Sequence, residues 1–135
     1  MLMMPFFVFF MLLVVEFGLL MWANVSIANA SREGARFAAA NCATGSCTEA
    51  LIQARVIDRS GGILKAGDEA QITVSWPNGK ALGANVDVAV NHPHGLLFLP
   101  QWPGSGSPAS VALKSCAKMR LESAESPVTP VGVPC

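Results

Sequence analysis

The chain has 135 residues, nine basic and nine acidic, so its formal net charge at pH 7 is zero. Charged residues make up only 13% of the sequence. They form no basic patch dense enough to indicate nucleic-acid binding. The length fits one domain, or one small domain with an appendage.

The first 23 residues form an apolar run that contains a single charge, Glu16. About 20 residues are enough for a helix to cross the hydrocarbon core of a bilayer. We therefore predict two parts. Residues 1–23 are an apolar helix half that serves as a membrane span or a filament core, and residues 24–135 form a globular head.

The residues around the apolar run leave its processing open. No Lys or Arg precedes the run, and the first positive charge is Arg32, whereas a signal peptide or signal anchor ordinarily begins with basic residues. Either the N-terminus points outward or a basic leader has been removed, and we favour removal. A competing interpretation is a signal peptide that is cut after Ala28-Asn29-Ala30.

The sequence predicts one long helix over about residues 5–40. Pro5 is compatible with a first helical turn, and no other proline occurs up to residue 40. The first half is apolar all round, which suits burial in lipid or among other helices. From Ala23 onward small residues recur, so a sheet can pack closely on this half, where Arg32, Glu33 and Arg36 supply the charge.

The segment "NCATGSC" ends this helix. A second, short helix is expected over about residues 49–59, with Thr48 as its N-cap and Gly61-Gly62 after its end.

Four cysteines in a small chain with an export-type N-terminus predict two disulfides. Three pairings are open. We favour Cys42–Cys47 and Cys116–Cys135, because each joins near neighbours around a loop.

Beyond residue 70 the apolar period changes from 3.6 to 2. The segments "AQITVSW", "ANVDVAVNH" and "ASVALKSCAKMRLE" each alternate apolar and polar residues, and "PNGK" between the first two contains the hairpin signal Asn-Gly. We predict a small antiparallel sheet of about three to four strands, packed by its apolar face on the C-terminal half of the long helix. The Pro-rich tail can fold over the other face. The fold class is α+β.

A long apolar loop, "HPHGLLFLPQWPGSGSP", is expected between the second and third of these strands. It covers one end of the sheet or contacts a neighbouring subunit through Leu97, Phe98 and Trp102. The pair His92 and His94 stands too far from the cysteines in sequence to predict a metal site.

The sequence does not favour an enzyme. It contains no Gly-x-Ser-x-Gly elbow, no His-Glu-x-x-His, no phosphate-binding glycine loop and no cluster of paired carboxylates. No cofactor, metal ion or small-molecule substrate is indicated.

Several motifs occur in an order typical of one family. Pro5, Glu16-Phe17-Gly18 and the Arg32-Glu33-Gly34-Ala35-Arg36 block follow one another along the predicted helix, and "CAKMRLES" closes the last strand. Together they resemble TadE-like proteins, which are pseudopilins of tight-adherence pili and relatives of type IV pilins. The resemblance implies a pilin-like fold, a non-enzymatic function and association with the inner membrane and a pilus assembly machinery before polymerisation.

Three functions are compared. The first is a structural subunit of an extracellular, pilus-like filament that polymerises with copies of itself through the apolar helix. The second is a minor, membrane-anchored pseudopilin that aids assembly. The third is a single-span envelope protein whose small β domain binds a ligand at "HPHG" or near Trp102. We expect the first, with the finished filament at the cell surface.

The candidate site residues fall into four groups. The residues expected to pack in the helix core of an assembly are Met1, Pro5, Glu16, Phe17, Gly18 and Trp22. The residues expected to pack between the helix and the head are Arg32, Glu33, Gly34 and Arg36. The third group is the four cysteines, and the fourth is the apolar loop with Leu97, Phe98 and Trp102. Met1 lies about 22 Å from Glu16 along one helix, so these two cannot pair within a chain. We predict that Glu16 pairs between subunits, or is neutral and hydrogen-bonded to backbone.

Overall fold

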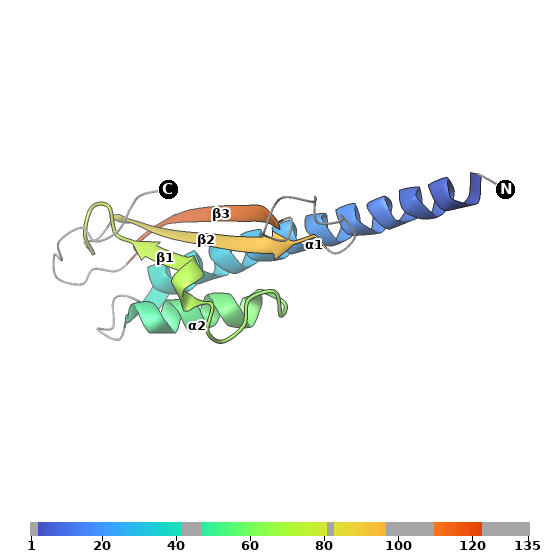
Figure 1. Cartoon of the computed structure of the whole chain (residues 1–135). Coiled ribbons are helices and arrows are strands. Elements are labelled where there is room, and N and C mark those ends of the chain that lie inside the picture. Colours follow the sequence, from blue (N-terminus) through green and yellow to red (C-terminus); the bar gives the residue numbers. More distant parts are fainter. Residues whose placement is uncertain (1–2, 42–46, 81–82, 97–109, 123–135) are drawn as a thin grey trace.

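The computed structural model describes residues 3–41, 47–80, 83–96 and 110–122 (Figure 1). Two helices come first, α1 (Met3–Asn41) and α2 (Glu49–Arg59), followed by the short 3-10 helix η2 (Glu69–Gln71). The strands are β1 (Ile72–Ser75), β2 (Asn85–Gly95) and β3 (Ser110–Arg120). The predicted α+β class, the long helix and the short second helix are confirmed.

The described strands form an antiparallel sheet in the order β1-β2-β3. The sheet lies along the C-terminal half of α1, and α2 packs beside the same half, while the N-terminal half of α1 projects away from the head (Figure 1). The predicted packing of the sheet on the small-residue half of the helix is therefore confirmed.

The core follows from two periodicities. Small side chains of α1, including Ala30, Ala35 and Ala38, are fully buried and let the sheet approach the helix closely. From the sheet, alternate residues such as Val86, Val88 and Val90 point into the same core. On β3 the predicted inner positions are more buried than the outer ones, although Val111 remains 40% exposed.

Two features differ from the sequence prediction. Pro93–Gly95, expected in a loop, belong to β2 and pair with the first residues of β3. Pro93 is tolerated there because β1 pairs with β2 only as far as Val90, which leaves one side of β2 without a described partner strand.

The second difference concerns the outer face of the sheet. The alternation in "AQITVSW" predicts that Ser75 points away from the core face, and Asp87 lies opposite it in the register. However, Ser75 is only 2% exposed and Asp87 is fully buried. Strand alternation predicts on which side of a sheet a residue points, but it does not predict what covers that side.

Candidate assembly surface

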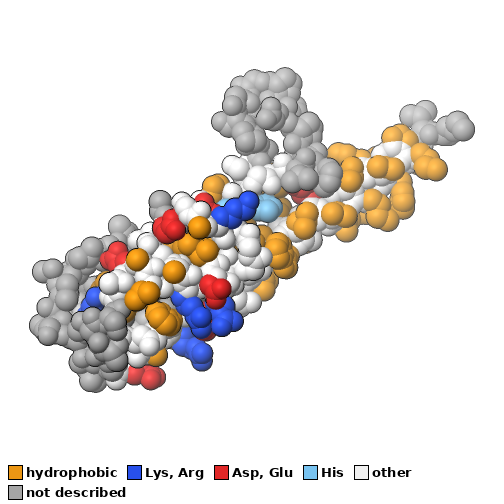
Figure 2. All heavy atoms as spheres, turned by 90° about the horizontal axis from the view of Figure 1, so that it is seen from below, with side chains coloured by type: hydrophobic (Ala, Val, Ile, Leu, Met, Phe, Trp, Pro, Cys, Tyr) orange, Lys and Arg blue, Asp and Glu red, His pale blue; other side chains and the backbone are white. Residues whose placement is uncertain are grey.

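The projecting half of α1 is an exposed apolar surface. Its large side chains are open to the surroundings, from Met3 at 84% through Phe10 at 57% to Trp22 at 54%. Figure 2 shows these side chains gathered around the projecting helix. Among the described residues, α1 is long and apolar enough to cross a membrane. Water alone would solvate such a surface poorly, so it requires lipid or protein around it.

Glu16 marks the point at which the helix meets the head. Counted along the described part of α1, it is the first buried residue, at 5% exposure. It lies on the same helical stripe as Leu20, Ala23 and Ile27, which are spaced three or four residues apart. The head contact thus starts seven residues before Ala23.

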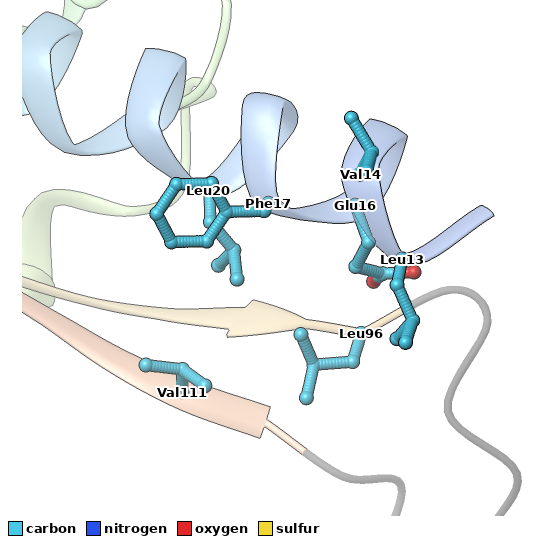
Figure 3. A pocket seen from close by; sticks show the side chains of 7 residues that line it. All are labelled: Leu13, Val14, Glu16, Phe17, Leu20, Leu96 and Val111. Atoms are coloured by element: carbon cyan, nitrogen blue, oxygen red, sulfur yellow. The ribbon is translucent and has the colours of Figure 1, made fainter. Parts of the chain in front are cut away.

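A pocket of about 550 Å³ adjoins Glu16. Its described walls come from α1, the residue after β2 and the start of β3, as Figure 3 shows: Leu13, Val14, Glu16, Phe17, Leu20, Leu96 and Val111. The carboxylate points toward the side where the two strands end, near Leu13 and Leu96 (Figure 3). Glu16 also has an interaction partner in the structure.

The other residues predicted for the helix core are placed differently. Phe17 is 64% exposed, and a β-carbon added at Gly18 would meet no other atom within 4 Å. Phe17 lines the pocket but remains mostly exposed, and the space beside Gly18 is open, so both positions are accessible to other molecules. Pro5 is exposed near the start of α1, and Met1 lies outside the described residues.

The predicted helix–head contact is formed by Gly34 and Glu33. Gly34 is buried, and a β-carbon added there would clash with the side chain of Val56 on α2. Only a glycine lets the two helices approach this closely.

An ion-pair network surrounds this crossing. A Glu33 oxygen lies 3.5 Å from the guanidinium of Arg55 on α2, and its other oxygen lies 3.3 Å from Arg36. Arg55 also lies over the ring of Phe37, 5.9 Å from its centroid. Arg32 is exposed and pairs with no acid within the described residues.

Two polar contacts that the sequence did not reveal hold the sheet in place. The Ser31 hydroxyl on α1 lies 2.9 Å from the Ser115 hydroxyl on β3, within hydrogen-bonding distance. On the outer face, an Asp87 oxygen lies 3.5 Å from the Lys118 ammonium, although the carboxylate oxygens accept no hydrogen bond from the described residues. An aspartate among valines of an alternating strand is the signal that could have revealed this pair.

The histidines that were considered for ligand binding are part of the sheet. The Nδ1 atom of His92 lies 2.7 Å from the side-chain oxygen of Gln71, so His92 joins β2 to the segment before β1. Across the described ranges, no group of His, Cys, Asp and Glu is placed to hold a metal ion.

Only some of the residues predicted to form disulfides lie within the described part of the chain, and none of those named for the contact loop does. The thiols of Cys47 and Cys116 are not free. Cys42 and Cys135 lie outside the described residues, so the pairing stays a prediction. Leu97, Phe98 and Trp102, the predicted contact loop, also lie outside them.

Comparison with known proteins gives one match. Residues 1–36 match the family model of TadE-like proteins, whereas no curated protein and no solved structure matches the chain. The likeness of "CAKMRLES" to that family's last strand therefore stays a prediction. The match and the apolar helix together fit a pilus-related, membrane-anchored envelope protein. The similarity to TadE-like proteins thus covers the segment from the Pro5 turn to the Arg32–Arg36 block.

Proposed function

We propose that this protein is a structural subunit of an extracellular, pilus-like filament and acts without catalytic activity. The observation that carries the proposal is the projecting apolar half of α1, on which Met3, Phe10 and Trp22 are all more than half exposed. The match to TadE-like proteins over the same segment supports it.

The exposed helix accounts for the membrane-anchored stage and for the filament stage of such a subunit. A helix that is apolar on all sides is buried equally well by lipid and by other apolar helices. The same segment therefore anchors the subunit in the inner membrane before assembly and packs against copies of itself in the filament. The partners are other copies of the chain and the pilus assembly machinery.

The head is suited to the outside of the filament. Two disulfides, for which we favour Cys42–Cys47 and Cys116–Cys135, suit an oxidising environment outside the cytoplasm. At the helix–head junction, Gly34 and the Glu33–Arg55 pair fix the direction in which the head leaves α1.

The second candidate is a minor, membrane-anchored pseudopilin that aids assembly without forming the bulk of the fibre. The same exposed helix favours it equally, and abundance in purified filaments distinguishes the two. A single-span envelope protein with a ligand-binding β domain is less well supported, because His92 already contacts Gln71.

Negative-stain electron microscopy of the purified native protein tests the proposal. We expect thin filaments in which this chain is the most abundant component by mass spectrometry. Filaments that contain it only in trace amounts would support the minor pseudopilin instead. Single copies in detergent micelles, with no filaments under any condition of detergent removal, would contradict the main proposal.

A further inference from the structure

The end of β2 and the start of β3 lie beside the apolar half of α1. Leu96 directly follows β2, Val111 is the second residue of β3, and Gly95 pairs with Ser110 between them. We call Leu96 and Val111 the strand tip. Both line the pocket with Leu13, Phe17 and Leu20 of α1, so the tip lies at the level of the Glu16 turn (Figure 3).

The depth of this level in a membrane follows from helix geometry. A hydrocarbon core of about 30 Å takes about 20 residues of helix. If Met3 lies at one boundary, the other falls close to Ala23. Trp22 lies at that second boundary and is 54% exposed, and tryptophan is the residue typical of the membrane–water interface. After Val25, the exposed residues of the described helix are small or polar.

The strand tip is therefore carried into the same layer. Glu16 is seven residues before Ala23, which places it roughly 10 Å inside the hydrocarbon boundary. Because the head packs on α1 from Glu16 onward, it cannot keep this packing and also stand clear of the membrane.

The chemistry of the tip suits this position. Val111 is 40% exposed and Leu96 is partly exposed, so part of each apolar side chain is open to its surroundings at the pocket beside α1. Ser110 and Gly95 are paired across the two strands, which satisfies backbone groups that lipid could not. Beneath them, Glu16 is 5% exposed. A carboxylate at this depth is costly when it faces lipid.

We propose that the strand tip is a lipid-contacting surface. It enters the leaflet on the side of the head, beside α1, and keeps Glu16 away from lipid while the subunit is in the membrane. The inference rests on the membrane-anchored stage of the proposed function, and it adds a second membrane contact to the helix.

Depth-dependent fluorescence quenching tests this assignment. The full chain is reconstituted into vesicles of phosphatidylethanolamine and phosphatidylglycerol, with one environment-sensitive label on Val111→Cys. Matched controls carry the label on Val8→Cys, exposed on the projecting helix, and on Asn78→Cys, exposed in the turn between β1 and β2 at the far end of the sheet. The unsubstituted chain, treated without reductant, gives the background labelling of native cysteines.

Lipids that carry a nitroxide on the acyl chain are then added to the vesicles. We expect the label at Val111 to lose as much of its emission as the label at Val8, while the label at Asn78 keeps its emission. If the label at Val8 is quenched but the labels at Val111 and Asn78 both keep their emission, the inference on the strand tip is overturned and the membrane-anchored stage is not. No quenching at Val8 would overturn the membrane-anchored stage as well. Blue-shifted but unquenched emission at Val111 would mean that protein, such as a second copy, covers the tip, and would overturn the lipid assignment.

Discussion

Glu16 is a carboxylate on a helix half whose other described side chains are apolar or small. The structure buries it against the head of its own chain, beside Leu96. This placement leaves open its predicted pairing between subunits, because release or rearrangement of the strand tip during assembly would make the carboxylate accessible to a neighbour. Its location where helix meets head makes it a suitable point for fixing the register between subunits.

We predict that Glu16→Leu leaves the head folded but impairs filament assembly. Leucine occupies a similar volume beside Leu13 and Leu20, so the packing of this turn is kept, whereas the charge and its acceptor oxygens are lost. Circular dichroism checks folding and electron microscopy counts filaments. Glu16→Gln is the matched control, since it keeps a polar side chain of the same shape. Normal filament yield from Glu16→Leu would contradict the role.

Gly34 and Gly18 lie on one helix but in opposite environments. A methyl group at Gly34 would clash with Val56, whereas one at Gly18 would meet open space. We predict that Gly34→Ala lowers the free energy of unfolding by about 1–3 kcal/mol through overpacking. Gly18→Ala should be neutral or raise it by up to about 1 kcal/mol through helix propensity.

Thermal unfolding of both variants in detergent, followed by circular dichroism, distinguishes these outcomes. Equal midpoints would mean that α2 moves away from α1 at no cost, and that the close approach at Gly34 does not matter to the fold. A filament defect in Gly18→Ala with a normal midpoint would place Gly18 in a contact between helices of different subunits.

At the level of elements, the sheet is held on both faces. Valines of β2 pack on α1, and on the outer face the fully buried Asp87 depends on Lys118 of the neighbouring strand, 54% of whose side chain is exposed. A buried carboxylate without its cation is costly, so the pair links β2 to β3 more strongly than a surface ion pair would.

We predict that Lys118→Ala lowers the free energy of unfolding by about 2 kcal/mol, because Asp87 then keeps its burial but loses its charge partner. Lys114→Ala is the control: Lys114 is exposed on the same face of β3 and pairs with no acid among the described residues. Chemical denaturation of both variants measures the difference. Equal losses would show that the Asp87–Lys118 contact contributes nothing specific.

At the level of the whole molecule, the chain combines a head that has its own core with a helix half that lacks one. Most of the buried residues of α1 lie at or after Ile27, where they share one core with residues of α2 and the sheet. The large exposed apolar residues lie mainly before that point. Folding and self-association are therefore assigned to different parts of one continuous helix.

We predict that a variant beginning at Asn24 folds and is a monomer in the absence of detergent. It keeps the Gly34 crossing and the core residues of α1 from Ile27 onward. It loses the packing of Glu16 and Leu20 beside the strand tip, together with the exposed apolar surface that requires lipid or protein. Size-exclusion chromatography with light scattering measures its mass, and circular dichroism checks its secondary structure. Filaments formed by this variant would show that the head, and not the apolar helix, drives polymerisation.

The sequence alone determined the elements of this protein, since these depend on local periodicity. The predicted short helix over 49–59 coincides with α2, and the alternation in "ANVDVAVNH" identifies the inward valines of β2. The ordered motifs from Pro5 to Arg36 also identified the TadE-like segment that the family comparison confirms.

Only the tertiary structure decided which distant residues share an environment. That Glu16 lines one pocket with Leu96 and Val111, and that Asp87 is buried beside Lys118, depends on the register of β3 against β2 and on where the sheet lies along α1. These contacts join residues far apart in sequence, and no local pattern specifies them. The length of the apolar run predicted a membrane span, but only the position of the strand tip on that run indicates how deep the head lies.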